Sequence, residues 1–183
     1  MLWDEEVNLT IKSFSLYHIN SEIELSGSNE KWRLTGIYGN PETHRRHKTW
    51  SLLCNLASKY NTSWICMGDF NEILSTSEKE KGNARNRKQM DEFSKTLDTC
   101  KLRDMGYRGG QFTWSNGRIG VDHIRSRLDR CVSIIDWLAL FSRANVTHKI
   151  SGILDHCLFC YYCMEIGRQH INEVGSLSSK PFG

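Results

Sequence analysis

The alternation of apolar and polar residues predicts three strands in the first forty residues. Residues 7–11 alternate with period two, and residues 19–25 are predicted to form the hairpin partner of that strand. Residues 32–38 form a third predicted strand, which stops at Gly39-Asn40-Pro41. The chain is therefore expected to begin with a hairpin and one further strand.

The apolar period changes to 3.6 residues after Thr43, which predicts a first long helix ending near Tyr60. An apolar strand follows and closes at Asp69. Residues 75–89 are polar and basic and are predicted to form a loop, and a second helix is expected over residues 88–100.

The remainder of the chain contains shorter predicted elements. They are strands at residues 112–114, 127–132, 146–150 and 155–162, and a short helix at residues 136–141. Strands interleaved with two long helices predict a mixed α/β layered domain over residues 1–163. Residues 164–183 show no period and are predicted to be a loose C-terminal tail.

Composition fits one soluble domain. The chain has 183 residues, 39% of them hydrophobic and 25% charged, and a net charge of +3 is too small to indicate a nucleic-acid binder by itself. No apolar run approaches the roughly 20 residues that span a bilayer, and the first residues do not resemble a signal peptide. We therefore expect an intracellular protein of the nucleus or cytoplasm, not secreted, with no membrane association and with its seven cysteines reduced.

Candidate chemistry appears where the fourth strand ends, in Gly68-Asp69-Phe70-Asn71. Side chains alternate along a strand, so a strand ending in Asp-x-Asn places a carboxylate and a carboxamide on the same side. Such a pair suits a hard divalent cation and a phosphate oxygen, and Asp155-His156 suits proton transfer. The combination indicates metal-dependent phosphodiester chemistry. The structural alternatives are a turn capped by Asp69 and Asn71 and a surface pair at 155–156.

Several motifs, in order along the chain, resemble those of the endonuclease/exonuclease/phosphatase superfamily, which includes DNase I and the apurinic endonucleases. They are Tyr38-Gly39-Asn40-Pro41, Gly68-Asp69-Phe70-Asn71-Glu72, Phe112-Thr113-Trp114-Ser115-Asn116, Arg127-Leu128-Asp129-Arg130 and Asp155-His156. Residues 89–93 and 102–107 add to the likeness, which covers roughly residues 2–162. The sequence looks most like the endonuclease domain of plant LINE-type (non-LTR) retrotransposons.

The resemblance implies a DNase I-like four-layer sandwich, with two mixed sheets face to face and helices outside, lacking its first strands. It also implies hydrolysis of DNA phosphodiesters with Mg²⁺, Mn²⁺ being an alternative, and without a small-molecule cofactor or a protein partner. Five residues take catalytic roles by this resemblance: Tyr38, Asp69, Asn71, Asp129 and His156.

Each of these residues has a distinct implied role. Tyr38 would contact the scissile phosphate, Asp69 would orient the attacking water, and Asn71 would hold a phosphate oxygen. Asp129 would pair with His156. The residue implied at the metal is Asp155, and those on the DNA-facing side are Thr113, Trp114 and Asn116.

Two departures from the family pattern bear on activity. The family has an Asn and a metal-binding Glu on strands preceding the segment that Leu2-Trp3 matches, and this sequence has no counterpart for them. Leu154 also stands where the family has Ser. We therefore expect a retroelement-derived remnant of a DNA endonuclease with weak or no activity. The alternatives are a non-catalytic nucleic-acid-binding protein and a phosphatase of the same superfamily.

Individual residues keep structural interpretations beside the functional ones. Tyr38 fits a core position with its hydroxyl at the rim, Trp114 fits packing as well as base stacking, and Asp129 has arginine neighbours for a salt bridge. Glu72 and the segment 44–48 are expected to be solvated.

Two further motifs have competing interpretations. The basic residues of the segment before the second helix form either a solvated loop or a track for the DNA backbone; they are Lys79, Lys81, Arg85, Arg87 and Lys88. Cys157, Cys160 and Cys163 have metal-like spacing but lack a second pair of ligands. They are therefore interpreted as small buried side chains of the last predicted strand.

Overall fold

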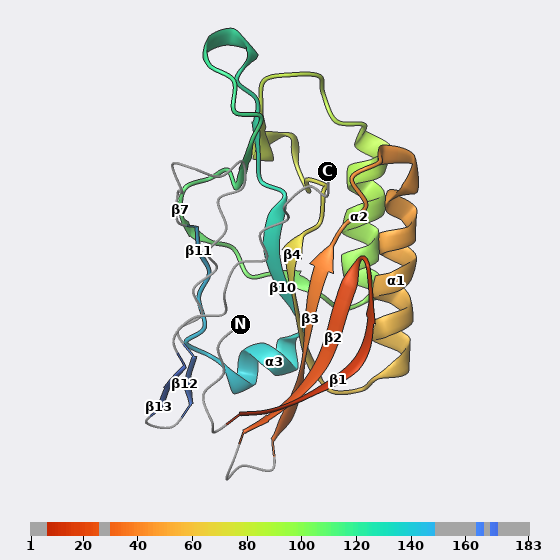
Figure 1. Cartoon of the computed structure of the whole chain (residues 1–183), viewed down its shortest axis with the longest axis vertical. Helices are drawn as coiled ribbons and strands as arrows, with labels where there is room; N and C mark the ends of the chain where they lie inside the picture. The colour runs from red at the N-terminus through yellow and green to blue at the C-terminus, as the bar shows by residue number, and fades with distance from the viewer. Residues whose placement is uncertain (1–6, 26–29, 149–163, 167–168, 172–183) are drawn as a thin grey trace.

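A six-stranded mixed sheet is the centre of the computed structural model, which describes residues 7–25, 30–148, 164–166 and 169–171 (Figure 1). The strand order is β1-β2-β3-β4-β10-β6. The strands are β1 (Val7–Ser15), β2 (His18–Leu25), β3 (Lys31–Tyr38), β4 (Ser63–Asp69), β10 (Asp129–Ser133) and β6 (Arg103–Asp104). The β3–β4 pair is parallel and the other pairs are antiparallel.

Three α-helices lie on the two faces of this sheet among the described residues: α1 (Arg46–Lys59), α2 (Arg87–Thr99) and α3 (Ile135–Leu140). Figure 1 shows α1 and α2 side by side on one face and α3 on the other. Asn86 caps α2 by accepting a hydrogen bond from the Lys88 amide at 2.9 Å, which satisfies a free donor of the first turn. Both long helices therefore begin and end close to where the apolar period predicted.

The apolar side chains of the sheet alternate between two cores. Cys66 packs with the α1 and α2 residues, where Trp50 and Phe93 stack with their ring centroids 4.5 Å apart. Ile65, the preceding residue of β4, packs in the opposite core with Trp137 of α3. Because both faces of β4 are covered, its central residues form a continuous apolar run.

Smaller strand pairs extend the structure beyond the main sheet. They are β7 (Arg108–Gly109) with β11 (Thr147–His148), the sheet β5 (Lys79–Glu80), β9 (Arg125–Ser126) and β8 (Trp114–Ser115), and β12 (Met164–Ile166) with β13 (Gln169–Ile171). Short 3₁₀ turns occur at η1 (Thr43–Arg45), η2 (Thr76–Glu78) and η3 (Gly120–Asp122). No helix in the described part of the chain is long and apolar enough to cross a membrane.

The predicted mixed α/β layered architecture is confirmed, with differences in the short elements. The segment 75–89 was predicted to be a loop but contains η2 and β5. The strand predicted at 112–114 is β8, which starts at Trp114. Within the predicted tail, β12 and β13 form a hairpin. The strand predicted at 155–162 lies outside the described residues.

Candidate active site

Three predicted site residues lie side by side where three neighbouring central strands of the main sheet end, a place that we call the sheet edge. Tyr38, the last residue of β3, is paired with Asp69, the last residue of β4. Asp129, the first residue of β10, is paired with Asp69 from the other side. Both carboxylates are buried, whereas Tyr38 is 39% exposed. A row of two acids and a phenol therefore faces the edge of the sheet, and Tyr38 is no core residue.

Two glycines allow the backbone to approach closely at this edge. A Cβ on Gly68 would lie 2.1 Å from the carbonyl oxygen of Ile37, and its φ of +134° is one that other residues rarely adopt. A Cβ on Gly39 would lie 2.3 Å from the carbonyl oxygen of Phe70. The backbones carrying Tyr38 and Asp69 can come this close only because both positions lack a side chain.

Asn71 makes two hydrogen bonds to Asp69 and one to the backbone of Gly39. Its backbone amide donates to Asp69 Oδ1 at 2.7 Å, and its Nδ2 donates to Asp69 Oδ2 at 2.9 Å and to the Gly39 carbonyl at 2.8 Å. The φ of Asn71 is +55°, a left-handed conformation that asparagine tolerates. The alternation of side chains along a strand, from which the Asp69–Asn71 contact was predicted, is thus not its cause, because β4 ends at Asp69. The two side chains meet because Asp69 caps a turn, the structural alternative raised from the sequence.

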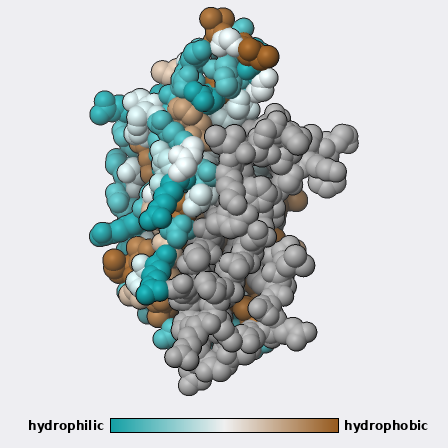
Figure 2. Space-filling model, turned by 90° about the vertical axis from the view of Figure 1, so that its left-hand side faces the viewer, coloured by the Kyte–Doolittle hydropathy of each residue, from teal (hydrophilic) through white to brown (hydrophobic). Residues whose placement is uncertain are grey.

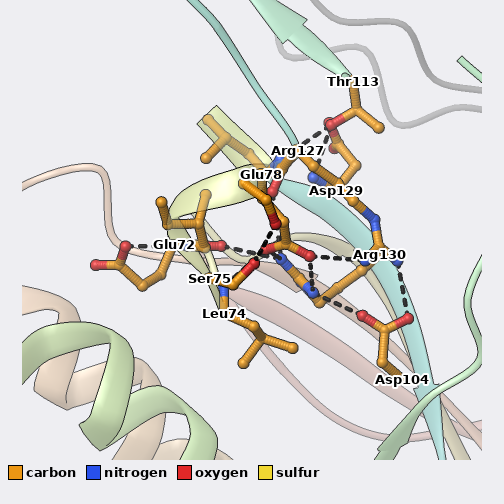
Figure 3. A network of polar contacts seen from close by, with 12 residues as sticks. Glu72, Leu74, Ser75, Glu78, Asp104, Thr113, Arg127, Asp129 and Arg130 are labelled. Atoms are coloured by element: carbon orange, nitrogen blue, oxygen red, sulfur yellow. Dashed lines mark hydrogen bonds and ion pairs between the residues drawn. The ribbon is translucent and has the colours of Figure 1, made fainter. Parts of the chain in front are cut away.

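Thr113 fixes the backbone that carries Asp129. Its Oγ1 accepts hydrogen bonds from the amides of Leu128 and Asp129, both at 3.0 Å (Figure 3). The amide of Phe70 in turn donates to the Leu128 carbonyl at 2.9 Å. Thr113 is buried and lies behind Asp129, so the contacts that it makes here support the carboxylate and not a ligand.

The environment of Tyr38 favours a protonated hydroxyl. Burial raises the pKa of Tyr38, and the nearby Asp69 and Tyr17 raise it further. The backbone of Tyr38 also donates to the Tyr17 carbonyl at 2.9 Å, which ties the site to the β1–β2 turn. At neutral pH the hydroxyl is therefore a hydrogen-bond donor beside a carboxylate.

The other two residues expected on the DNA-facing side contact the protein itself. Trp114 packs against the small core formed by Ile73, Met90 and Leu128, which agrees with its packing interpretation. Asn116 closes the loop between β8 and β9: its Nδ2 donates to the Asp122 carbonyl at 2.7 Å, and its Oδ1 accepts from the Ile124 amide at 3.0 Å.

The loop closed by Asn116 projects from the molecule. In Figure 1 it forms the upper tip, and Figure 2 shows hydrophobic surface at that end. Ile119 is 94% exposed and Val121 is 85% exposed.

The arginines beside Asp129 make a closed ion-pair ring with two other carboxylates, which we call the arginine ring (Arg127, Arg130, Glu78 and Asp104; Figure 3). Arg127 contacts Glu78 and Asp104, each at 2.8 Å, and Arg130 contacts them at 2.8 and 2.6 Å. Each arginine thus has Glu78 and Asp104 as carboxylate partners. This ring was not predicted from the sequence.

Two predictions of solvated side chains are wrong. The side chain of Glu72 is fully buried, and Arg46 of segment 44–48 is only 5% exposed. Their ion pair of 2.7 Å explains both, because each charge is compensated inside the protein. The pair joins α1 to the segment that follows Asn71, a contact between residues 26 positions apart that periodicity does not reveal.

His148 is a buried residue near the site that the sequence did not single out. Its ring stacks on Tyr107 with the centroids 4.5 Å apart, and its Nδ1 lies 2.7 Å from the Gly110 carbonyl. Burial lowers the pKa of His148, although the Gly110 contact opposes this. The ring is therefore predominantly neutral at neutral pH. Asp129 is among the charged groups that influence it.

The remaining predicted residues cannot be placed. Asp155, His156, Cys157, Cys160 and Cys163 lie outside the described residues. Within the described ranges, no group of three His, Cys, Asp or Glu side chains is arranged to hold a metal ion. The carboxylates of Asp69 and Asp129 are nevertheless the ligand type that Mg²⁺ prefers, and Mg²⁺ commonly binds one or two carboxylates together with substrate phosphate.

No family model matches the sequence, and no curated protein matches it. Solved structures match the fold. The endonuclease domain of TRAS1, a telomere-specific non-LTR retrotransposon, has a TM-score of 0.65 at 18% identity, over 85% of this chain and 68% of that one.

Two further structures have lower scores. One is an endonuclease/exonuclease/phosphatase family protein from Bacteroides thetaiotaomicron, with a TM-score of 0.40 at 13% identity over 64% of this chain and 41% of that one. The other is D. rerio TDP2 complexed with a single-strand DNA product, with a TM-score of 0.42 at 14% identity over 79% and 56%.

The TRAS1 likeness shows the fold. The chain has a DNase I-like fold, as predicted from the sequence.

Proposed function

We propose that this chain is a retroelement-derived DNA endonuclease that hydrolyses phosphodiesters at the sheet edge formed by β3, β4 and β10. The observation that carries the proposal is the pairing of Asp69 with both Tyr38 and Asp129 across neighbouring strands. Residues from three distant parts of the sequence thereby supply a hydrogen-bond donor and two carboxylates to one place. The solved endonuclease domain with the same fold supports the choice of reaction.

In this proposal each side chain acts from the position described above. The protonated hydroxyl of Tyr38 donates to a non-bridging phosphate oxygen and stabilises the charge that grows on it. Asp69, held by Asn71, accepts a hydrogen bond from the attacking water and orients it. Asp129, held by Thr113, orients His156 for proton transfer.

Mg²⁺ is the proposed metal, with Mn²⁺ as an alternative, and Asp155 is the proposed additional ligand. When bound, such an ion would neutralise charge on the phosphate. Glu22 and Glu24 of β2 lie opposite Arg33 and Lys31 of β3, towards the far end of that strand from Tyr38, and each forms an ion pair with a lysine, so we do not expect them to hold this ion.

A plasmid-nicking assay with Mg²⁺ tests the proposal, comparing the wild-type protein with Asp69→Asn. Loss of a positioned acid–base group is expected to lower the nicking rate by about 100-fold or more. Asp91→Asn is the matched control. Asp91 is an exposed carboxylate of α2, so this substitution should leave the nicking rate unchanged. Asp155→Ala and His156→Ala are expected to behave like Asp69→Asn.

Three other outcomes would replace the proposal. Nicking that survives Asp69→Asn would point to a contaminating nuclease. DNA binding without nicking by the wild-type protein would favour the non-catalytic nucleic-acid-binding alternative. Release of phosphate from small phosphate esters, with no nicking of DNA, would favour the phosphatase.

A further inference from the structure

A second charged cluster lies directly behind the candidate active site. Glu72 follows Asn71, and both of its carboxylate oxygens are engaged: Oε2 accepts from Arg46 Nη1 at 2.7 Å and Oε1 accepts from the Ile73 amide at 2.9 Å. Arg46 is further held by the Pro41 carbonyl. The Arg46–Glu72 pair is therefore a satisfied structural contact.

Arg85 approaches the same carboxylate but is not satisfied by it. Its Nε lies 3.8 Å from Glu72 Oε1, which is longer than a hydrogen bond. The Arg85 side chain is 21% exposed, and its buried Nε has no hydrogen-bond partner among the described residues. The buried Nε atoms of Arg46, Arg127 and Arg130 have no partner among the described residues either, so this atom does not mark a ligand. What a ligand can reach is the exposed part of the Arg85 side chain.

The charge balance differs from that of the arginine ring. There, two arginines face two carboxylates. Here, Arg46 and Arg85 share the single carboxylate of Glu72. Burial and the Arg46 charge lower the pKa of Arg85, while Glu72 and Asp69 act to raise it. Arg85 is thus a partly buried cation next to Glu72 that also interacts electrostatically with Asp69, a carboxylate of the candidate site.

Arg85 also differs from most of the other basic residues of its segment. Lys81, Arg87 and Lys88 are exposed, and Lys79 is half-buried with its Nζ donating to the Asn83 carbonyl. Arg85 is held partly inside the protein between Glu72 and the start of α2. A planar guanidinium held in this way can present two parallel donors to one phosphate group, which a mobile surface lysine does less well.

We propose that Arg85 binds a non-bridging oxygen of a backbone phosphate of the DNA substrate beside Asp69. The inference rests on the proposed function for the identity of the substrate, but the phosphate-binding group itself is defined by the cluster of Arg46, Glu72 and Arg85. Arg85 would add a second positively polarised contact to that of Tyr38.

Binding of a short fluorescein-labelled DNA duplex in EDTA tests the proposal without cleavage. Arg85→Gln is expected to raise the Kd by about tenfold and to reduce the slope of log K against log salt by about one. Arg85→Lys keeps the charge but loses the paired donors, so its Kd should lie between those of the wild-type protein and Arg85→Gln. The matched control is Arg87→Gln, which removes the same charge from an exposed position and should change the Kd by less than about twofold.

Thermal unfolding with and without inorganic phosphate separates this inference from the proposed function. Phosphate is expected to raise the Tm of the wild-type protein and of Arg87→Gln, but not that of Arg85→Gln. If it does so while no variant nicks DNA, the enzyme proposal fails and the phosphate site stands. The inference would be overturned if phosphate raised the Tm of Arg85→Gln as much as that of the wild-type protein, or if it did not raise the Tm of the wild-type protein. It would also be overturned if Arg85→Gln and Arg87→Gln lost DNA affinity equally.

Discussion

Asn71 combines backbone conformation and side-chain chemistry at one position. Its left-handed φ turns the chain sharply after β4, and the same turn brings its amide groups onto both oxygens of Asp69. A local conformation thus positions the carboxylate, and Gly68 and Gly39 provide the space for it. Residue identity here is determined by backbone geometry as much as by chemistry.

Stability measurements on Asn71 variants test this coupling. Both Asn71→Ala and Asn71→Gly lose the side-chain bonds to Asp69 and Gly39. Alanine also pays about 1 kcal/mol for the left-handed conformation, which glycine adopts freely. Urea unfolding should therefore find the alanine variant less stable than the glycine variant by about 1 kcal/mol. Equal stabilities, or a more stable alanine variant, would mean that the turn relaxes to another conformation.

The arginine ring shows how elements are joined around the site. Glu78 comes from η2, Asp104 from β6, and the two arginines flank Asp129 at the start of β10. The ring thereby fixes the segment that follows Asp69 and Asn71 against the strand that carries Asp129. The guanidinium of Arg127 also lies over the aromatic side chain of Tyr107, and that of Arg130 lies over Phe93. The arginine ring is therefore held by packing as well as by ion pairs.

The ring predicts an acid-sensitive fold. Burial acts to raise the pKa of Glu78, but hydrogen bonds and charge from Arg130, together with the Leu74 amide and Arg127, lower it overall. The pKa of Asp104 is lowered in the same way, against its burial, by Arg127 and Arg130. Because folding depresses both values, the stabilisation is complete above the unfolded values of about 4 and is lost as pH falls through the folded values.

Unfolding free energies measured across the acid range check this prediction. The wild-type protein should lose stability steeply below about pH 4, where the unfolded chain takes up protons first. Glu78→Gln should be less stable at pH 7 by about 3 kcal/mol, since it leaves a buried arginine undercompensated, and its pH profile should be flatter. Glu92→Gln, at an exposed position of α2, should keep the wild-type profile. A Glu78→Gln profile parallel to that of the wild-type protein would contradict the assignment to the ring.

At the scale of the whole molecule, one sheet separates two cores and supports the site at its edge. Phe93 lies in the core under α1 and α2, and Trp137 lies in the core under α3. Since β4 contributes neighbouring residues to both, the two cores share the same central strand. We therefore expect the main sheet and its covering helices to unfold as one unit.

Paired core variants test that unity. Phe93→Leu and Trp137→Phe should each lower the unfolding free energy by about 1–3 kcal/mol, and the double variant should show their sum within about 0.5 kcal/mol. Tryptophan fluorescence and far-ultraviolet circular dichroism should give the same midpoint for every variant. Separate transitions, with only one of them shifted by each substitution, would show that the cores unfold independently.

The long elements and the fold could be predicted from the amino-acid sequence alone. Period-two and 3.6-residue patterns placed the hairpin, the strands around Asp69 and both long helices. They could do so because the spacing of apolar residues along a short segment shows which face of a strand or helix is buried. The motif containing Asp69 and Asn71 and the one containing Asp129 identified the candidate site in the described part of the chain. These patterns and motifs lie within short segments, so they can be recognised without knowing which elements pack together in the folded protein.

The pairing of charged side chains became evident only from the folded arrangement of the chain. Arg46 with Glu72 and Arg130 with Glu78 join residues 26 and 52 positions apart, and a charged side chain in the sequence gives no sign of whether a distant partner will cover it. Glu72 and Arg46 were predicted to be solvated for this reason, and the partly buried Arg85 could not be distinguished from its exposed neighbours. Hydrophobic period encodes which face is buried, whereas charge compensation depends on three-dimensional proximity that only the assembled sheet and helices create.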